Sequence, residues 1–239
     1  MRIASLPMYD LPGVRADWDA LWAAARPALT HAGIPAPAKL SRPIDLHRHW
    51  NDPRLVLSQT CAPPWRDGLH RHTAVVGAFD FGLPGCPPGW YRSHLVVRDD
   101  ECRPVGALLD RGRVAINGYD SYSGHGSLVA LGHPPRAPLV TGAHVNSVAA
   151  LRLGAADIAA IDAVSWRFLS RLPGRLSGLR IVGHTRPHPG TPVILSRKYD
   201  PHAARAAIAA AVALLPVSAR ARLGLRGLVP LGDRDYRAA

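Results

Sequence analysis

The stretch NGYDSYSGHGSL, residues 117–128, brings hydroxyl side chains and glycines together directly after a short apolar run. Serine hydroxyls and the unpaired N–H groups at a helix start bind phosphate-like groups without a formal positive charge. The contributing residues are Asp120 and Ser121 as candidate N-caps and, in the first turn, Ser123, Gly124 and His125. Ordinary helix capping explains the same residues, so both interpretations stay open. The stretch is not a nucleotide P-loop, because no lysine follows its last glycine.

Histidine pairs form a second group of interest, because the motif LHRH occurs at residues 46–49 and again at 69–72. On a strand, H-x-H spacing would place both imidazoles on one face as metal ligands. Residues 47 and 49 are predicted on a helix, where side chains two positions apart diverge. We therefore expect solvated histidines, and the sequence predicts no metal ion and no other cofactor.

The three cysteines, Cys61, Cys86 and Cys102, are odd in number and lack C-x-x-C spacing, so no disulfide framework is predicted. Cys61 is expected to be a small packed residue rather than a nucleophile. The sequence has no G-x-S-x-G elbow and no G-x-G-x-x-G dinucleotide loop. These motifs therefore identify no enzyme class.

Strand and helix signals alternate along most of the chain and would position these residues. The first helix is predicted over residues 14–33, with Trp18, Leu21, Trp22 and Leu29 on one side and a glycine stop. Further helices are predicted at 45–50, from Ser121, at 144–154 and at 201–216. Buried strands are predicted at 2–8, 54–60, 73–81, 93–99, 113–117 and 179–185. Strands separated by helices indicate a parallel sheet covered on both faces.

Two segments rich in proline, near residues 82–90 and 184–192, cross between two parts of the chain. The predicted fold is α/β with two lobes, each a mostly parallel sheet flanked by helices. Lobe 1 comprises residues 1–85 plus 185–239, and lobe 2 comprises residues 86–184. Two lobes joined by two crossings make a clamp, and we expect the ligand cleft between them.

The composition of the chain limits the classes of partner that it is expected to bind. The chain has 239 residues, 47% of them hydrophobic, and a formal net charge of +12. Its arginines are dispersed and no aromatic residues interleave with them, so nucleic-acid binding is not expected. A solvated basic surface would instead concentrate a small anion. No apolar run is long enough to cross a bilayer, so membrane insertion is not expected. No export signal precedes MRIASLPMYD, which predicts a cytoplasmic protein, or a periplasmic one if a leader has been trimmed.

Six motifs occur in an order that resembles a known family. They are ASLPMYD at the start, LSQTC at 57–61, YRSHLVVR at 91–98, NGYDSYSG at 117–124, TGAHVNSVAAL at 141–151 and ADIAAIDAVSW at 156–166. The series resembles the phosphate, phosphite and phosphonate substrate-binding proteins of ABC transporters, which have the type II periplasmic-binding-protein fold. The resemblance covers roughly residues 1–195. It implies a small phosphate-, phosphite- or phosphonate-like ligand and a transporter permease as a partner.

The resemblance also implies which residues contact the ligand. The anion would lie at the serine-rich helix start, with His144 and Ser147 of TGAHVNS beside it. Asp162 falls where aminophosphonate binders direct a carboxylate toward the ligand amine. The remaining implied contacts are Tyr9, Ser58, Gln59, Thr60 and Tyr91.

The chemistry of two of these residues leaves alternatives. His144, at a predicted helix start, could donate to an oxyanion, with a charge that responds to pH near neutrality, or serve as a cap or core histidine. Asp162 follows an apolar strand, so it contacts the ligand or caps the next helix.

Two departures from the family pattern stand out. Ala62, Pro63 and Pro64 replace the glycine and aromatic residue that many relatives carry after the cysteine, which predicts a reshaped pocket on that side. The missing export signal argues against the transport role. A cytosolic enzyme on the same fold, such as a lyase of the menaquinone pathway acting on a small anion, therefore remains the alternative.

Overall fold

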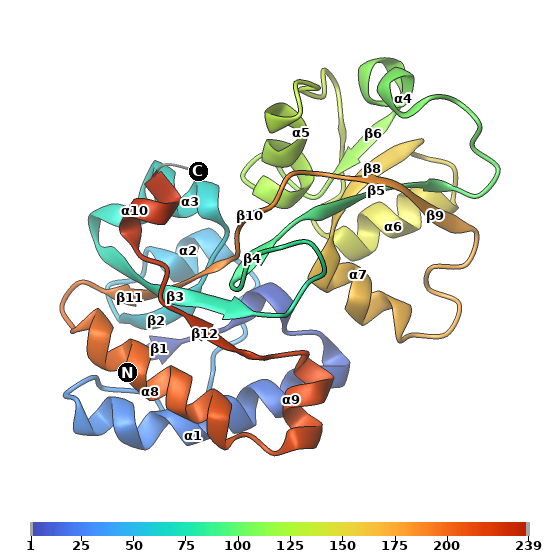
Figure 1. Cartoon of the computed structure of the whole chain (residues 1–239). Helices are drawn as coiled ribbons and strands as arrows, with labels where there is room; N and C mark the ends of the chain where they lie inside the picture. The colour runs from blue at the N-terminus through green and yellow to red at the C-terminus, as the bar shows by residue number, and fades with distance from the viewer. Residues whose placement is uncertain (1, 238–239) are drawn as a thin grey trace. The chain divides into compact units, whose positions relative to one another are not determined.

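The computed structural model describes residues 2–237, and the chain divides into two compact units (Figure 1). Unit 1 comprises Met1–Trp90 and Pro189–Ala239, and unit 2 comprises Tyr91–His188. The chain thus leaves unit 1 once and returns once. The boundaries fall after residues 90 and 188, where the sequence analysis placed them after 85 and 184.

Unit 1 is built on a five-stranded sheet. In spatial order its strands are β1 (Ile3–Ala4), β2 (Leu55–Gln59), β11 (Pro192–Ser196), β3 (Thr73–Asp80) and β12 (Gly227–Val229). Only β1 and β2 pair in parallel, whereas β11 is antiparallel to β2 and β3, and β12 is antiparallel to β3. The expectation of a mostly parallel sheet is therefore wrong here. The chain returning from unit 2 enters between β2 and β3 in the opposite direction, and a fully buried strand reads alike in either direction.

Helices cover both faces of this sheet (Figure 1). One face carries α1 (Arg15–His31), α8 (Pro201–Leu214) and α9 (Val217–Leu223), and the other carries α2 (Leu46–Trp50), α3 (Ala62–Asp67) and α10 (Asp233–Arg237). Short 3-10 turns occupy Pro7–Tyr9 (η1), Pro12–Val14 (η2) and Leu69–Arg71 (η3). The apolar side of α1 is buried as predicted, including Trp18, which is 0% exposed. The first strand is shorter than predicted, because η1 begins at Pro7.

Across the described residues, no single helix has the length and apolar composition to span a membrane. Only α8 and α9 taken together, bent by 112° at their junction, meet both requirements.

Unit 2 is built on a second five-stranded sheet. Its spatial order is β7 (Leu139–Val140), β6 (Val114–Ile116), β8 (Ile158–Asp162), β5 (Ser93–Arg98) and β9 (Leu179–His184). The pairs β6–β7 and β6–β8 are parallel, while β5 is antiparallel to both β8 and β9. This sheet is also mixed rather than mostly parallel. As a result, the C-terminal ends of β6, β7, β8 and β9 meet the start of β5 at one edge.

Alternate residues of this sheet face two separate helical layers. Leu95 and Val97 of β5 pack with α4 (Val105–Arg111) and α5 (Ser127–Ala130). Val96, between them, packs with α6 (His144–Arg152) and α7 (Ala163–Ser170). Unit 2 therefore has hydrophobic clusters on both faces of its own sheet.

The two connections between the units pair with each other. Strands β4 (Trp90–Tyr91) and β10 (His188–Pro189) form a two-stranded sheet. Next to them, the Gly190 N–H donates to the Gly89 carbonyl over 2.8 Å. A Cβ on Gly190 would lie only 2.7 Å from that carbonyl oxygen. Glycine at position 190 is therefore what allows the backbones to approach so closely.

Candidate functional site

The serine-rich stretch follows the C-terminal end of β6 and opens with a cap. It forms a turn of π-helix over Tyr122–Gly126 (η4) that continues into α5. Ser121 is the N-cap, and its Oγ accepts the Gly124 N–H over 3.3 Å. The His125 N–H donates to the Ser121 carbonyl over 3.2 Å. Asp120 is exposed before this cap. The capping interpretation therefore describes Ser121, and the N–H groups of Gly124 and His125 are used inside the turn.

Ser123 occupies a different position in the same turn. Its Oγ lies 2.7 Å from His144 Nε2 and 3.2 Å from Ser121 Oγ. Its carbonyl accepts hydrogen bonds from the hydroxyls of Ser93, over 2.8 Å, and Ser127, over 2.7 Å. Ser123 is buried, and partners from three other elements hold it in place. The predicted residues Ser123 and His144 are thus brought together from positions 21 residues apart in the chain.

His144 is the first residue of α6, as predicted. The residue as a whole is half-buried, but its Nδ1 is shielded from solvent and has no hydrogen-bond partner among the described residues. Burial lowers the pKa of His144 to about 4. The prediction that its charge responds to pH near neutrality is therefore wrong, because desolvation penalises the imidazolium. At pH 7 this ring is neutral.

Asn117, directly after β6, was not among the predicted contacts. Its side-chain Oδ1 is buried without a hydrogen-bond partner in the described part of the chain. A Cβ built on Gly124 would lie 1.9 Å from this oxygen. The absence of a side chain at Gly124 therefore makes room for the Asn117 amide.

Ser147 lies one turn into α6 and is buried. Its Oγ forms a 2.7 Å hydrogen bond with Thr141 Oγ1 and a longer one, 3.4 Å, to the Ala143 carbonyl. These contacts brace the start of α6, and hence His144. A direct contact between Ser147 and a ligand stays a prediction.

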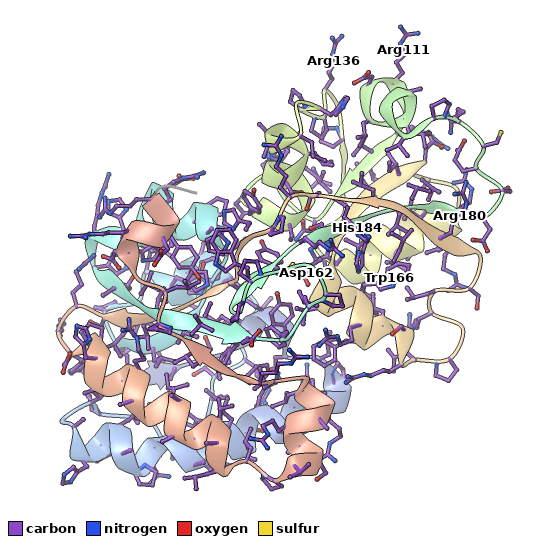
Figure 2. The ribbon with its side chains drawn as sticks, in the orientation of Figure 1. Arg111, Arg136, Asp162, Trp166, Arg180 and His184 are labelled. Atoms are coloured by element: carbon purple, nitrogen blue, oxygen red, sulfur yellow. The ribbon has the colours of Figure 1, made fainter. Side chains whose placement is uncertain are left out.

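Asp162 ends β8 and caps α7 (Figure 2). Its Oδ1 accepts the N–H groups of Val164, over 2.7 Å, and Ser165, over 2.8 Å. The residue is 3% exposed. Asp162 therefore acts as a helix cap, which is one of the two roles that the sequence allowed. Its contact with a ligand amine stays a prediction.

Aromatic rings gather around Tyr91 within unit 2. Tyr91 is buried and meets Tyr122 and His188 edge to face, with ring centroids 6.5 Å and 6.1 Å away. Tyr122 stacks on His188 at 3.5 Å. Sequence reasoning identified Tyr91 only. Tyr122 and His188 carry no local signal, because their contact joins η4 to β10.

In unit 1 the predicted contacts lie at the C-terminal end of β2, where Ser58, Gln59 and Thr60 are all 0% exposed. Ser58 Oγ lies 2.8 Å from Ser5 Oγ, which lies 2.8 Å from His49 Nε2. The expectation that both histidines of the first LHRH motif are solvated is therefore wrong for His49. It lies on the inner side of α2, and burial lowers its pKa.

The other predicted contacts of unit 1 are also buried. Gln59 Nε2 donates to Thr191 Oγ1 over 2.8 Å, and the side-chain oxygens of Gln59 and Thr60 have no partner among the described residues. Tyr9 packs edge to face on Phe81 at 5.0 Å. Thr191 was missed, since it belongs to the returning segment. A polar ligand group could donate hydrogen bonds to these buried oxygens. The C-terminal end of β2 is therefore a second candidate contact region.

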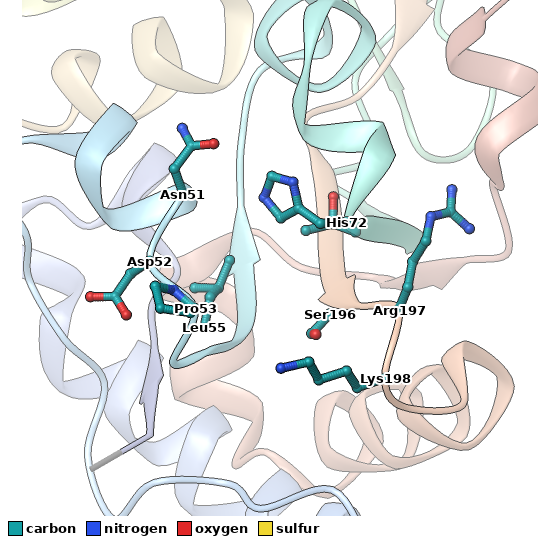
Figure 3. Close-up of a pocket in the computed structure, with 9 residues that line it drawn as sticks. Asn51, Asp52, Pro53, Leu55, His72, Ser196, Arg197 and Lys198 are labelled. Atoms are coloured by element: carbon teal, nitrogen blue, oxygen red, sulfur yellow. The ribbon is translucent and has the colours of Figure 1, made fainter.

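A pocket of about 540 Å³ lies at the other end of the unit 1 strands, where β2 and β3 begin and β11 ends (Figure 3). It is lined by Asn51, Asp52, Pro53, Leu55, His72, Thr73, Ser196, Arg197 and Lys198. Asp52 pairs with Arg54, and Arg197 with Asp233. No predicted contact residue is among the lining residues.

Comparisons with known proteins support the fold. No family model and no curated protein matches the chain. The solved structure of XAC2383 from Xanthomonas citri bound to chloride ion is 17% identical, with a TM-score of 0.72, and covers 99% of this chain and 95% of that one.

Two phosphonate-related structures are similarly close. PhnD1 from Prochlorococcus marinus in complex with methylphosphonate is 14% identical, with a TM-score of 0.71 and coverage of 99% of this chain and 94% of that one. A binding protein component of an ABC phosphonate transporter from Pseudomonas aeruginosa is 13% identical, with a TM-score of 0.73 and coverage of 98% and 82%. At these identities the similarity establishes the architecture. The chain has the two-lobed α/β fold of the periplasmic binding proteins.

Proposed function

We propose that the chain binds a small oxyanion of the phosphate or phosphonate class, and that Ser123 and His144 supply the central contacts in unit 2. The observation that carries this proposal is their 2.7 Å hydrogen bond, which leaves the shielded His144 Nδ1 without a partner. A buried polar group without a partner costs about 1–3 kcal/mol. A ligand oxygen at Nδ1 would remove that cost.

The tautomer of His144 decides whether this nitrogen suits an anion. If the Ser123 hydroxyl donates to Nε2, then Nδ1 carries the proton and is a hydrogen-bond donor. The opposite tautomer would present a lone pair to the anion. Binding therefore selects the Nδ1–H tautomer, with Ser123 as the group that fixes it.

The cluster is electrically neutral, which favours recognition by hydrogen bonds. Ser123 lies in the first turn of η4, where backbone N–H groups have no acceptor within the helix. Together with the Nδ1–H of His144, its N–H can contact a compact tetrahedral anion. The net charge of +12 would raise the local concentration of anions without supplying a specific contact.

The fold comparisons support the same ligand class. Two of the similar structures are a methylphosphonate complex and a component of an ABC phosphonate transporter. We infer a solute-binding role for an ABC uptake system, which requires a location outside the inner membrane, or a sensing role in the cytoplasm. Contacts from Tyr9, Gln59, Thr60, Tyr91 and a cleft between the lobes belong to this proposal and stay predictions.

The test is a thermal-shift screen followed by calorimetry. Methylphosphonate, 2-aminoethylphosphonate, phosphite, phosphate, a sulfonate and a carboxylate are compared on the parent protein. We expect one phosphorus oxyanion to raise the Tm most and to bind with a stoichiometry of one. Mass spectrometry after incubation should recover it unchanged. Conversion of the ligand would favour the alternative, an enzyme on this fold.

A histidine variant separates this site from general anion binding. His144→Gln should weaken the best anion by at least about tenfold, the effect of losing a hydrogen bond to a charged group. His133→Gln is the matched control, because His133 pairs with Asp110 on the surface of the same unit. If both variants bind as the parent does, or if no oxyanion raises the Tm, the proposal fails.

A further inference from the structure

Two histidines face each other across neighbouring strands of unit 2. His94 of β5 and His184 of β9 are register partners, and their Nδ1 atoms lie 2.9 Å apart. They are 90 residues apart in the chain, and neither belongs to an LHRH motif. His94 is half-buried and His184 is exposed, so the pair is open to solvent on one side.

An aromatic ring and the positive charge of Arg92 both act on this pair. The ring of Trp166 from α7 meets His94 edge to face at 6.0 Å. Burial lowers the pKa of both rings, and the positive charge of Arg92 lowers it further. Two imidazoles at this distance share one proton, donated from one Nδ1 to the lone pair of the other. The contact therefore requires one of the two Nδ1 atoms to be unprotonated.

We propose that His94 and His184 form a two-histidine chelate for a divalent transition metal ion, with Cu²⁺ and Zn²⁺ as the best-suited ions. Neutral imidazole nitrogens are the commonest protein ligands for these metals. Two nitrogens at about 2.0–2.1 Å from a tetrahedral ion lie roughly 3.3 Å apart. The observed 2.9 Å would have to open by only about 0.4 Å.

Binding of the metal ion to this pair needs no further reagent. The ring that donates in the free pair moves its proton from Nδ1 to Nε2, so both Nδ1 lone pairs point to the ion and no proton is released. In the described part of the chain, no group of three or more His, Cys, Asp or Glu side chains is placed to hold a metal. The remaining coordination positions therefore belong to water or to a small added ligand.

Calorimetric titration with CuCl₂ in a non-chelating buffer tests the site on the full chain. We expect one tight equivalent at pH 7, with Cu²⁺ bound more tightly than Zn²⁺. His94→Gln and His184→Gln should each weaken that equivalent by at least about tenfold. His31→Gln, which removes an exposed histidine at the end of α1, should not. The Tm of each metal-free variant checks that it is folded.

Trp166 provides an independent optical signal. Cu²⁺ bound beside it should quench its fluorescence, and Trp166→Phe should reduce the quenching without changing the affinity. If either histidine variant binds the first equivalent within about twofold of the parent, the chelate is ruled out.

Discussion

Ser123 and Ser121 sit two positions apart and have different partners, which gives them different roles. Ser121 accepts an N–H of its own turn, as an N-cap does. Ser123 contacts the imidazole of His144. One serine therefore acts on the stability of the helix, and the other on the proposed anion contact.

Replacing each serine by alanine should separate these roles. Ser123→Ala removes a hydroxyl near a charged ligand group, worth roughly 1.5–3 kcal/mol, so we expect affinity for the best oxyanion to fall by about 10- to 150-fold. Ser121→Ala should lower the free energy of unfolding by about 1 kcal/mol, with a smaller loss of affinity. Calorimetry and thermal denaturation on the same samples measure both.

Ser170→Ala is the control, because Ser170 Oγ donates to the Arg167 carbonyl on an exposed part of α7. It should change neither quantity. If Ser123→Ala and Ser121→Ala both bind the anion as tightly as the parent, the serine-rich turn is only a helix start.

The contact between Gly124 and Asn117 makes a steric prediction. A methyl group at position 124 would lie 1.9 Å from Asn117 Oδ1 and 3.1 Å from its backbone N, so Gly124→Ala must displace Asn117. We expect a loss of about 1–3 kcal/mol of stability, as in other overpacked sites, and weaker anion binding. Gly106→Ala, at an open position in α4, should instead stabilise by about 0.5–1 kcal/mol. Equal Tm changes in the two variants, read from thermal denaturation, would contradict this contact.

The sequence predicted part of this residue-scale picture. Ser121, Ser123 and His144 belong to motifs that can be read locally or through a family resemblance. Ser93, Tyr122 and His188 act through contacts that depend on the order of strands in the sheet. Asn117 stood inside the quoted stretch, but an unpaired buried oxygen is a property of packing, which no local pattern encodes.

Helix starts gather at one edge of the unit 2 sheet. Parallel pairing of β6 with β7 and β8 brings the starts of η4, α6 and α7 to the same edge. The antiparallel β5 begins there too, since Ser93 is the register partner of Asp162. The positive ends of several helix dipoles therefore point to one region, which favours an anion.

Asp162 stands at this edge, and two substitutions divide its roles. Asparagine caps a helix about as well as aspartate, so Asp162→Asn should keep the Tm, whereas Asp162→Ala should cost about 1 kcal/mol. If Asp162 pairs with a ligand amine, Asp162→Asn should weaken 2-aminoethylphosphonate more than ethylphosphonate. Calorimetry with both ligands measures the difference, and equal losses would leave Asp162 as a cap alone.

The alternation of strands and helices was predictable, and strand direction was not. The apolar runs that became β2, β3 and β8 are buried on both faces, and such runs look the same in parallel and antiparallel sheets. No helix was predicted at α3, which contains Pro63 and Pro64. Both prolines lie in its first turn, where their missing N–H groups cost nothing.

Several ionisable groups make the stability of the fold depend on pH in the same direction. Burial lowers the pKa values of His49, His94, His144 and His184. A group whose folded pKa lies below its unfolded value of about 6.5 stabilises the fold above that pH and loses this contribution as the pH falls. Bonding to Arg103 also lowers the pKa of Glu101, to about 2, so its contribution disappears at still lower pH.

We therefore expect the Tm to fall steadily from pH 7 to pH 4 and further below it. Thermal denaturation over this range measures the slope. His144→Gln and His94→Gln should each flatten the part between pH 6.5 and 4, because each removes one proton taken up on unfolding. A Tm that stays constant from pH 7 to pH 5 would contradict the lowered pKa values.

The hydrogen bond between Gly190 and Gly89 makes unit 2 an insertion whose two ends are neighbours. Residues 91–188 should therefore be excisable as an independent chain, and a short glycine linker from 90 to 189 should reseal unit 1. The excised fragment retains Ser123, His144 and the His94–His184 pair. Its affinities for the anion and for Cu²⁺ can be compared with those of the full chain. The comparison would show how much of each binding free energy comes from unit 2 alone.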